Sequence, residues 1–251
     1  MSRQVRAKRL GPYFEAQLTL ARRIAELTGA RLGETAFHVT NLHRRLGLGV
    51  PGETPSEAWR GYAARLEATV GLAAQVHLTQ EAFLAAPEER LPPPEQTAFG
   101  CFAYSPPGED GRVRMHFYNL DTDEAGGPLA ASKMARRKAE LAAMVAHIRA
   151  AHPQAIGIQG RSWLYNLEAY RRLFPPVYGA SRTALDGPPG LQGSSSWGQL
   201  IDSREAIRPQ VRDAFTANLE ALDPRAPWRV FPLQALTAAA PMEAFEAFYA
   251  V

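Results

Sequence analysis

The spacing of hydrophobic residues over the first ninety positions is that of amphipathic helices. Apolar side chains recur every three or four residues over 12–29, which predicts a first helix. The same spacing predicts a second helix over 34–46, a third that starts at a capping Thr54, and a short fourth over 79–86. Residues 1–91 are therefore expected to form a helical N-terminal lobe.

Two stretches after position 96, 97–105 and 112–120, are predicted to be β-strands. In the second, apolar Val113, Met115 and Phe117 alternate with polar residues. Residues 106–111 lie between the two stretches, and their two prolines and two glycines are a strong turn signal. They predict an antiparallel hairpin. If the hairpin closes symmetrically, Cys101 lies opposite His116.

Helical and strand patterns then follow one another along the chain. An acidic, glycine-bearing loop over 121–128 leads into a long helix over 129–151, and a short buried strand is expected over 155–159. The remaining predicted elements are a helix over 167–174, a mobile loop over 183–196, a helix over 203–222 that Pro209 may begin, a strand over 228–233 and a final helix over 241–250.

Three consecutive prolines at 92–94 indicate a stiff spacer between two parts of the chain. We therefore predict two domains, a helical lobe over 1–91 and an α/β lobe over 95–251. The fold class is mixed α+β. The second lobe is expected to hold a mixed, mainly antiparallel sheet flanked by helices.

Composition is that of an ordinary globular protein, with 251 residues, 46% of them hydrophobic and 21% charged. A single cysteine, Cys101, excludes an intrachain disulfide and fits a reducing compartment. No apolar segment follows the basic residues of 1–10, so we expect a disordered tail there and not a secretory signal. No apolar run approaches the ~20 residues needed to span a bilayer. We expect a cytoplasmic protein with no membrane partner.

Four cations, Lys133, Arg136, Arg137 and Lys138, cluster in the first turns of the long predicted helix. Cations at this end oppose the positive pole of the helix dipole. Two interpretations remain open. Either an anionic ligand compensates the charges, or the acidic residues of 121–124 do so within the chain.

The second predicted strand carries Arg114, His116 and Tyr118 on one face. These side chains could line a substrate pocket, with His116 as a general base because its ordinary pKa lies near neutrality. The alternative is a polar outer face of the hairpin. Cys101 beside His116 would suit a nucleophile and base, or else a small buried hydrophobic residue.

Residues 160–166, after the predicted buried strand, are dense in groups that bind ligands. Arg161 could hold a carboxylate or phosphate, and Trp163 and Tyr165 could stack on a planar group. The alternative is a packed aromatic corner whose polar atoms find partners within the backbone.

The order of elements over 97–180, together with Asn166 and Ala169 in the pattern Asn-x-x-Ala, resembles the second half of the GNAT-type N-acyltransferases. The resemblance implies adjacent parallel strands splayed apart beside the long helix. It also implies an acyl-CoA cosubstrate and a small amine acceptor. The family's tyrosine acid would fall near Leu173, so Tyr170 or Tyr165 would have to take its place.

On this resemblance the expected site residues fall into three groups. The residues expected to hold the cofactor are Gly126, Gly127, Leu129, Lys133, Arg136, Arg137 and Asn166. Those expected to act in catalysis are His116, Tyr118 and Tyr170. Those expected to contact the small-molecule substrate are Arg114, Arg161, Trp163 and Tyr165.

Other classes of function are kept open. A non-enzymatic protein could use a basic helical lobe to bind nucleic acid or a partner protein, although no nucleic-acid motif is present. An enzyme of unfamiliar family could act on a small metabolite through residues 160–166. His38 and His43 lie five apart and do not share a helical face, so no metal site is predicted. The sequence does not specify an oligomeric state.

Overall fold

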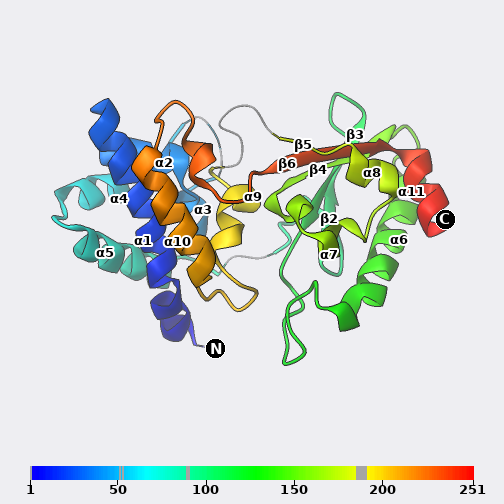
Figure 1. The fold of residues 1–251 in the computed structure, drawn as a ribbon, viewed down its shortest axis with the longest axis horizontal. Helices are drawn as coiled ribbons and strands as arrows, with labels where there is room; N and C mark the ends of the chain where they lie inside the picture. The colour runs from blue at the N-terminus through cyan, green and yellow to red at the C-terminus, as the bar shows by residue number, and fades with distance from the viewer. Residues whose placement is uncertain (1, 51, 53, 89–90, 185–190) are drawn as a thin grey trace. The chain divides into compact units, whose positions relative to one another are not determined.

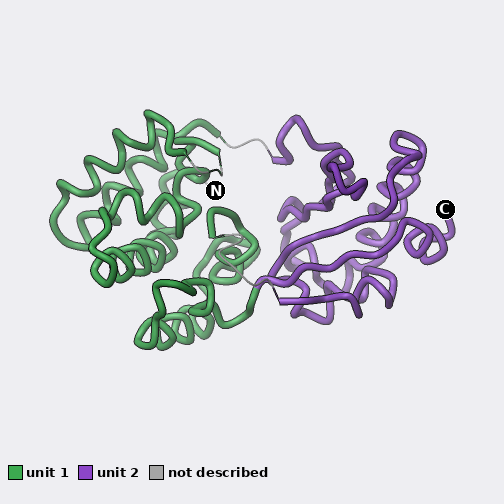
Figure 2. Tube along the Cα trace, turned by 90° about the horizontal axis from the view of Figure 1, so that it is seen from above, with its two compact units in different colours: residues 1–89, 186–234 green, residues 90–185, 235–251 purple. Residues whose placement is uncertain are grey.

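The computed structural model describes residues 2–50, 52, 54–88, 91–184 and 191–251 (Figure 1). The chain divides into two compact units (Figure 2). Unit 1 comprises residues 1–89 and 186–234, and unit 2 comprises 90–185 and 235–251. The lobes expected from the sequence, 1–91 and 95–251, thus differ from these units because 186–234 returns to the helical one.

Unit 1 is built from helices around one apolar core. Its α-helices are α1 (Arg3–Thr28), α2 (Leu32–Val39), α3 (Leu42–Arg45), α4 (Glu57–Ala68), α5 (Leu72–Ala85), α9 (Ser194–Trp197) and α10 (Pro209–Asn218). Short 3₁₀ turns are η3 (Gly198–Leu200), η4 (Leu219–Ala221) and η5 (Pro227–Val230). No helix among the described residues of either unit is long and apolar enough to cross a bilayer.

The N-terminal segment corrects the expectation of a disordered tail over 1–10. Helix α1 begins at Arg3, where the Ser2 hydroxyl accepts a hydrogen bond from the Val5 N–H. Ala7 and Leu10 are buried in the core of unit 1. Burial of these two apolar side chains explains why a strongly basic segment is helical.

Three further boundaries in unit 1 differ from the prediction. The single helix expected over 34–46 is interrupted between α2 and α3, where the Asn41 N–H donates to the Gln17 side chain at 3.0 Å. Helix α4 is capped by Ser56 instead of Thr54, and α5 starts at Leu72, well before residue 79. Pro209 does begin α10, as predicted.

The strand expected over 228–233 is wrong. Residues Pro227–Val230 form η5, and Val230 and Phe231 are buried in the core of unit 1. Their apolar side chains therefore reflect packing against helices and not a place in the sheet.

Unit 2 contains an open six-stranded sheet with the order β1-β2-β3-β4-β6-β5. Its strands are β1 (Thr97–Phe99), β2 (Phe102–Ser105), β3 (Arg112–Phe117), β4 (Gly157–Ser162), β5 (Thr183–Ala184) and β6 (Leu236–Pro241). Only β3 and β4 pair in parallel, and the other pairs are antiparallel. The predicted mixed, mainly antiparallel sheet is confirmed, but β6 was not anticipated.

The predicted hairpin is confirmed as β2 and β3, with a different register. Ala103, and not Cys101, lies opposite His116. The stretch expected as one strand turns back at Gly100, whose φ of +59° favours glycine, so that β1 and β2 pair with each other. The shift is two residues, which leaves each side chain on its predicted face.

The helices of unit 2 are α6 (Met134–Ala151), α7 (Glu168–Arg171), α8 (Pro176–Ala180) and α11 (Met242–Tyr249), with 3₁₀ turns η1 (Ala131–Lys133) and η2 (Trp163–Asn166) (Figure 1). Side chains from the four helices and η2 pack on one face of the sheet, against Val113, Met115 and Ile158. The sheet therefore has one apolar face, which is covered, and one polar face, on which Arg114, His116 and Arg161 alternate with these core residues.

Candidate functional site

Strands β3 and β4 run side by side for only part of their length. Their parallel ladder has three pairs and ends at Arg114 opposite Gln159. Both strands continue for three residues beyond this point, to Phe117 and Ser162, without pairing further with each other. The two strands therefore diverge at their carboxyl ends.

The direction of the β3 backbone in this gap follows from its other neighbour. The Tyr118 N–H donates to the Cys101 carbonyl at 2.8 Å, which places Tyr118 in a hydrogen-bonded pair with β2. Hydrogen-bonded and non-hydrogen-bonded pairs alternate along an antiparallel ladder. The N–H and carbonyl groups of Met115 and Phe117 therefore point away from β2 and toward β4. The Met115 carbonyl and the Phe117 N–H lie beyond the last ladder pair, so they line the gap.

The β4 backbone can be oriented in the same way. The Ala239 N–H of β6 donates to the Ser181 hydroxyl at 2.9 Å and thus points away from β4. Gln159 and Ala239 therefore form a non-hydrogen-bonded pair. Arg161, two residues later, forms the same kind of pair with Thr237, because the two kinds of pair alternate along the strand. The backbone of Arg161 therefore faces β3 across the gap.

The polar face beside the gap groups several predicted residues. Arg114, His116 and Tyr118 lie on it together, as the alternation predicted. The His116 Nε2 lies 2.9 Å from the Ser105 hydroxyl, and the Tyr118 hydroxyl donates to Gln96 at 2.7 Å. The predicted pairing of Cys101 with His116 is wrong because of the register shift. Ser105 was not singled out, and only the true register would have revealed it.

Arg161 lies on the same polar face as Arg114. Gln159 pairs with Arg114, and Arg161 follows two residues later on the adjacent strand. The Arg161 side chain is half-buried. Its burial and the charge of Arg114 lower the pKa of its guanidinium below the ordinary value. Strand pairing thus places Arg114 and Arg161 on neighbouring strands of one face.

On the apolar side, the end of β4 is closed by tyrosines. Tyr165, Tyr170 and Tyr178 are buried, and the Tyr165 and Tyr178 hydroxyl oxygens lie 2.5 Å apart. A Cβ on Gly160 would come within 2.0 Å of the Tyr165 hydroxyl, so this close approach requires glycine. The Tyr170 ring contacts the Phe117 ring at 5.3 Å between centroids.

Burial has two consequences for these expected site residues. It raises the pKa of the Tyr165 and Tyr170 phenols well above the ordinary value, so both stay protonated at neutral pH. Because Tyr165 is buried, its ring is not exposed to stack on a planar ligand. Trp163 is buried as well, and its carbonyl accepts a hydrogen bond from the Asn166 side chain at 2.8 Å. The packed aromatic corner is the arrangement found.

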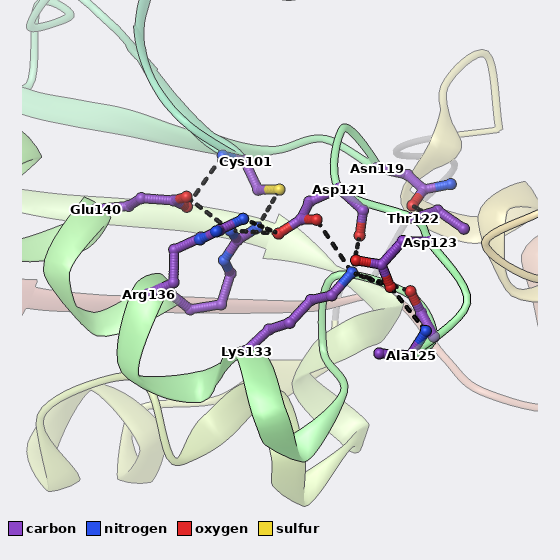
Figure 3. A network of polar contacts seen from close by, with 11 residues as sticks. Cys101, Asn119, Asp121, Thr122, Asp123, Ala125, Lys133, Arg136 and Glu140 are labelled. Atoms are coloured by element: carbon purple, nitrogen blue, oxygen red, sulfur yellow. Dashed lines mark hydrogen bonds and ion pairs between the residues drawn. The ribbon is translucent and has the colours of Figure 1, made fainter.

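The start of α6 shows how its cations are compensated (Figure 3). The Lys133 Nζ lies 3.0 Å from an oxygen of Asp121 and 3.0 Å from one of Asp123. It also donates to the Gly126 carbonyl at 3.1 Å. The hydrogen bonds from Lys133 hold the pKa of the Asp121 and Asp123 carboxyls below the ordinary value. Of the two interpretations of the cation cluster, compensation within the chain therefore describes Lys133.

Arg137 is compensated in the same network. Its guanidinium is buried and lies 2.9 Å from Asp121 and 2.7 Å from Glu140, with the Cys101 sulfur as a further contact. Arg136, which is exposed, pairs with Asp121 at 3.1 Å. Burial raises the pKa of the Cys101 thiol. The network fixes the acidic loop to α6 and leaves Cys101 as a buried thiol.

The other residues expected to hold a cofactor near this loop have structural contacts. The Gly127 carbonyl accepts a hydrogen bond from the Ala130 N–H at 3.0 Å, and Leu129 packs against the core of unit 2. The loop thus folds on itself and contributes to the core. It does not present the open anion site that the resemblance implies.

Cations without a carboxylate partner occur elsewhere in unit 2. Lys138, Arg171 and Arg182 line an open groove of about 640 Å³, with Phe248 among its apolar residues. The ion pair of Arg172 and Glu168 lines the groove as well. Within the described residues none of the three cations forms an ion pair. The Lys138 ammonium lies 5.9 Å from the centre of the Phe248 ring. This groove was not predicted, because its cations come from three separate stretches of sequence.

Several basic residues of unit 1 form ion pairs within that unit. Arg6 and Arg45 both pair with Glu205, and Arg31 pairs with Glu67. Among the residues that the structure describes, no three His, Cys, Asp or Glu side chains are grouped so that they could hold a metal ion.

Comparison with known proteins does not assign the chain to a family. No protein-family model matches the sequence, and neither a curated protein nor a solved structure matches it. The function must therefore be argued from the residues and their geometry.

Proposed function

We propose that unit 2 is a GNAT-like acyltransferase that moves an acyl group from acyl-CoA to a small amine. The observation that carries this proposal is the partial β3–β4 ladder, which ends at Arg114 and Gln159 while both strands continue. A parallel sheet interrupted in this way has backbone groups that an extended ligand can use. The long helix α6 connects the two strands, as the resemblance implies.

The order of elements after this gap also supports the proposal. Strand β4 ends at Ser162, and Asn166 and Ala169 follow in η2 and α7, where the family pattern Asn-x-x-Ala would lie. Asn166 uses its side chain to close the η2 turn by donating to the Trp163 carbonyl. Its role here is to shape the turn that follows the gap.

The gap suits the amide-bearing arm of a CoA thioester. Extended ligands bind to exposed strand edges through alternating backbone hydrogen bonds. The Phe117 N–H could donate to an amide carbonyl of the arm, and the Met115 carbonyl could accept from an amide N–H. Such a ligand would continue the β3 ladder where β4 leaves it.

The phosphates of the cofactor need cations other than those at the start of α6. Lys133 and Arg137 are already compensated by carboxylates. We assign the phosphates to the groove lined by Lys138, Arg171 and Arg182, where the cations have no ion pair among the described residues. Arg171 directly follows Tyr170, whose ring contacts Phe117 at the gap.

The polar face supplies the group needed for acyl transfer. The amine nitrogen attacks the thioester carbonyl carbon, the carbon–sulfur bond breaks, and the products are an amide and a thiol. His116 accepts the proton that the amine loses, and this proton then passes to the departing thiolate. The Ser105 hydroxyl orients the His116 ring through its contact with Nε2. Tyr170 and Tyr165 are positioning residues in this scheme because they are buried.

The direct test is calorimetric titration of the full chain with acetyl-CoA and octanoyl-CoA, together with a thermal-shift measurement. Binding should raise the melting temperature and depend on the groove. The double variant Arg171→Glu with Arg182→Glu should weaken acyl-CoA binding by tenfold or more. Arg149→Glu is the control, because Arg149 is an exposed arginine of α6 that pairs with Glu246 and does not line the groove; it should change acyl-CoA binding little. Absence of binding and of stabilisation at millimolar acyl-CoA would contradict the proposal.

A further inference from the structure

The groove that Lys138, Arg171 and Arg182 line has an excess of positive charge. Four cations and one carboxylate are among its lining residues, and the carboxylate, Glu168, pairs with the fourth cation, Arg172. The excess is therefore three positive charges, and their side chains form no ion pair among the described residues. A cleft lined by one sign of charge attracts ligands of the opposite sign, so the groove favours an anion.

An aromatic ring lies beside these charges. Phe248 of α11 lines the same groove and is 37% exposed. The Lys138 ammonium lies over this ring, 5.9 Å from its centre. The ring is also held from α11, because the Phe248 ring meets the Tyr249 ring edge-on at 5.0 Å, and the Tyr249 hydroxyl donates to the Leu173 carbonyl. The groove therefore presents an exposed aromatic surface next to unpaired cations.

The groove has room for a ligand beside the ring. Its volume of about 640 Å³ lies within the range of roughly 300 to 1,000 Å³ that is typical of small-molecule sites. Gly179 of α8 lines it, and a Cβ added at this glycine would have open space around it. A larger side chain at Gly179 would therefore extend into the groove and occupy the volume that a ligand needs.

We propose that the groove binds a purine nucleotide with two phosphate groups, with the base on the Phe248 ring and the phosphates on Lys138, Arg171 and Arg182. This inference rests on the proposed function, which assigns the phosphates of the cofactor to the groove, and adds the base and the ring that recognises it. Aromatic side chains bind bases by stacking. Two phosphate groups carry a charge of about −3 to −4 at neutral pH, which matches the excess charge of the groove.

Calorimetry on the full chain with adenosine 3′,5′-bisphosphate, pyrophosphate and adenosine tests the two halves of this site. The bisphosphate should bind most tightly, because only this probe engages both the ring and the cations. Phe248→Leu keeps an apolar side chain and removes the ring. It should weaken binding of the bisphosphate about tenfold and leave that of pyrophosphate unchanged. Phe248→Tyr keeps a ring and should bind the bisphosphate as the wild type does.

A second variant, Gly179→Met, fills the groove without changing a charge or an aromatic ring. It should weaken binding of both the bisphosphate and pyrophosphate by tenfold or more. Gly61→Met is the matched control, since Gly61 of α4 also has open space around it but belongs to unit 1. Circular dichroism of each variant confirms that its fold is intact.

The outcomes separate this inference from the proposed function. If the bisphosphate does not bind, if Phe248→Leu weakens both phosphate probes equally, or if a single-stranded oligodeoxyadenylate binds more tightly than the bisphosphate, the nucleotide site is wrong. The inference also fails, and acyl transfer stands, if acetyl-CoA slows hydrogen exchange of the Phe117 amide while Phe248→Leu and Gly179→Met leave its affinity unchanged. If the bisphosphate binds as expected but acetyl-CoA leaves exchange of Phe117 unaltered, the nucleotide site stands and acyl transfer fails.

Discussion

Two groups of cations in unit 2 differ in their acidic neighbours. Lys133, Arg136 and Arg137 at the start of α6 form ion pairs with Asp121, Asp123 and Glu140. Lys138, Arg171 and Arg182 line an open groove and form no ion pair among the described residues. The first group holds the acidic loop to α6, and the second is the group that we propose holds the phosphates of the cofactor.

The difference shows that a cluster of basic residues has no meaning until its acidic neighbours are placed. At the start of α6, the acidic residues precede the helix by a few positions and can fold back on it. In the groove, the packing of α6, α7 and the segment after α8 brings three cations together from separate stretches of the sequence. Stability should therefore depend on the first group and ligand binding on the second.

The largest effect on stability is expected from Arg137→Met. The change removes a buried cation and leaves the carboxylates of Asp121 and Glu140 without their shared partner. Loss of one partner from a buried ion pair costs about 4 kcal/mol of unfolding free energy. Urea denaturation measures it. Arg136→Met, which removes an exposed partner of Asp121, should cost less than about 1 kcal/mol. Equal losses in the two variants would show that the network contributes nothing by being buried.

The buried imidazole of His43, in unit 1, makes the stability of the protein depend on pH. Both ring nitrogens of His43 are buried without a hydrogen-bond partner, and burial lowers the pKa of its imidazole from 6.5 to about 4. The unfolded chain therefore takes up a proton below pH 6.5 that the folded chain takes up only near pH 4. The unfolding free energy should fall by about 3 kcal/mol between pH 7 and pH 4 from this group.

The variant His43→Leu should remove this part of the pH dependence, which urea denaturation at several pH values would measure. His38→Leu, a change at an exposed neighbour, should leave it in place. If the slope of stability against pH is the same in the wild type and in His43→Leu, the imidazole is not held neutral by burial.

The packing of the tyrosines against the end of β4 can be tested by Gly160→Ala. The added methyl would meet the Tyr165 hydroxyl at 2.0 Å and the Tyr178 hydroxyl at 2.7 Å, and both rings are buried. Overpacking of this kind should cost about 2 kcal/mol of unfolding free energy. Gly179→Ala, in α8 with open space around it, should be neutral or slightly stabilising. A tolerated Gly160→Ala would mean that the tyrosines do not close the end of β4.

The smallest effect on stability is expected in the groove. Arg171→Gln and Arg182→Gln each remove a cation that forms no ion pair among the described residues. Their unfolding free energies should stay within about 0.5 kcal/mol of the wild type. A loss like that of Arg137→Met would place them in the fold and would remove the contrast between the two groups.

Local patterns predicted much of unit 2. The β2–β3 hairpin followed from the turn residues 106–111, and the shared face of Arg114 and His116 followed from alternation in the second strand. Helix α6 followed from its helical spacing. Strand β6 was missed because Leu236–Pro241 is rich in alanine, a weak strand former, and ends in proline. Its place between β4 and β5 depends on long-range pairing that no local pattern carries.

The sequence predicted only part of the candidate site, because that site also depends on long-range strand pairing. The gap depends on where the β3–β4 ladder stops, and Ser105 reaches His116 only in the true register. The inward direction of Tyr165 depends on the absence of a side chain at Gly160, which brings the ring against β4. The acidic partners of Lys133 were present in the sequence as one of two interpretations, and the structure selects between them.

The central claim is that the gap between β3 and β4 holds the arm of an acyl-CoA. Hydrogen exchange at the Phe117 amide, followed by NMR, tests it most directly, because this N–H lies beyond the last ladder pair. Saturating acetyl-CoA should slow exchange of Phe117 by tenfold or more. Adenosine 3′,5′-bisphosphate, which has phosphates but no arm, should leave it unchanged. Unaltered exchange of Phe117 in millimolar acetyl-CoA would contradict the account.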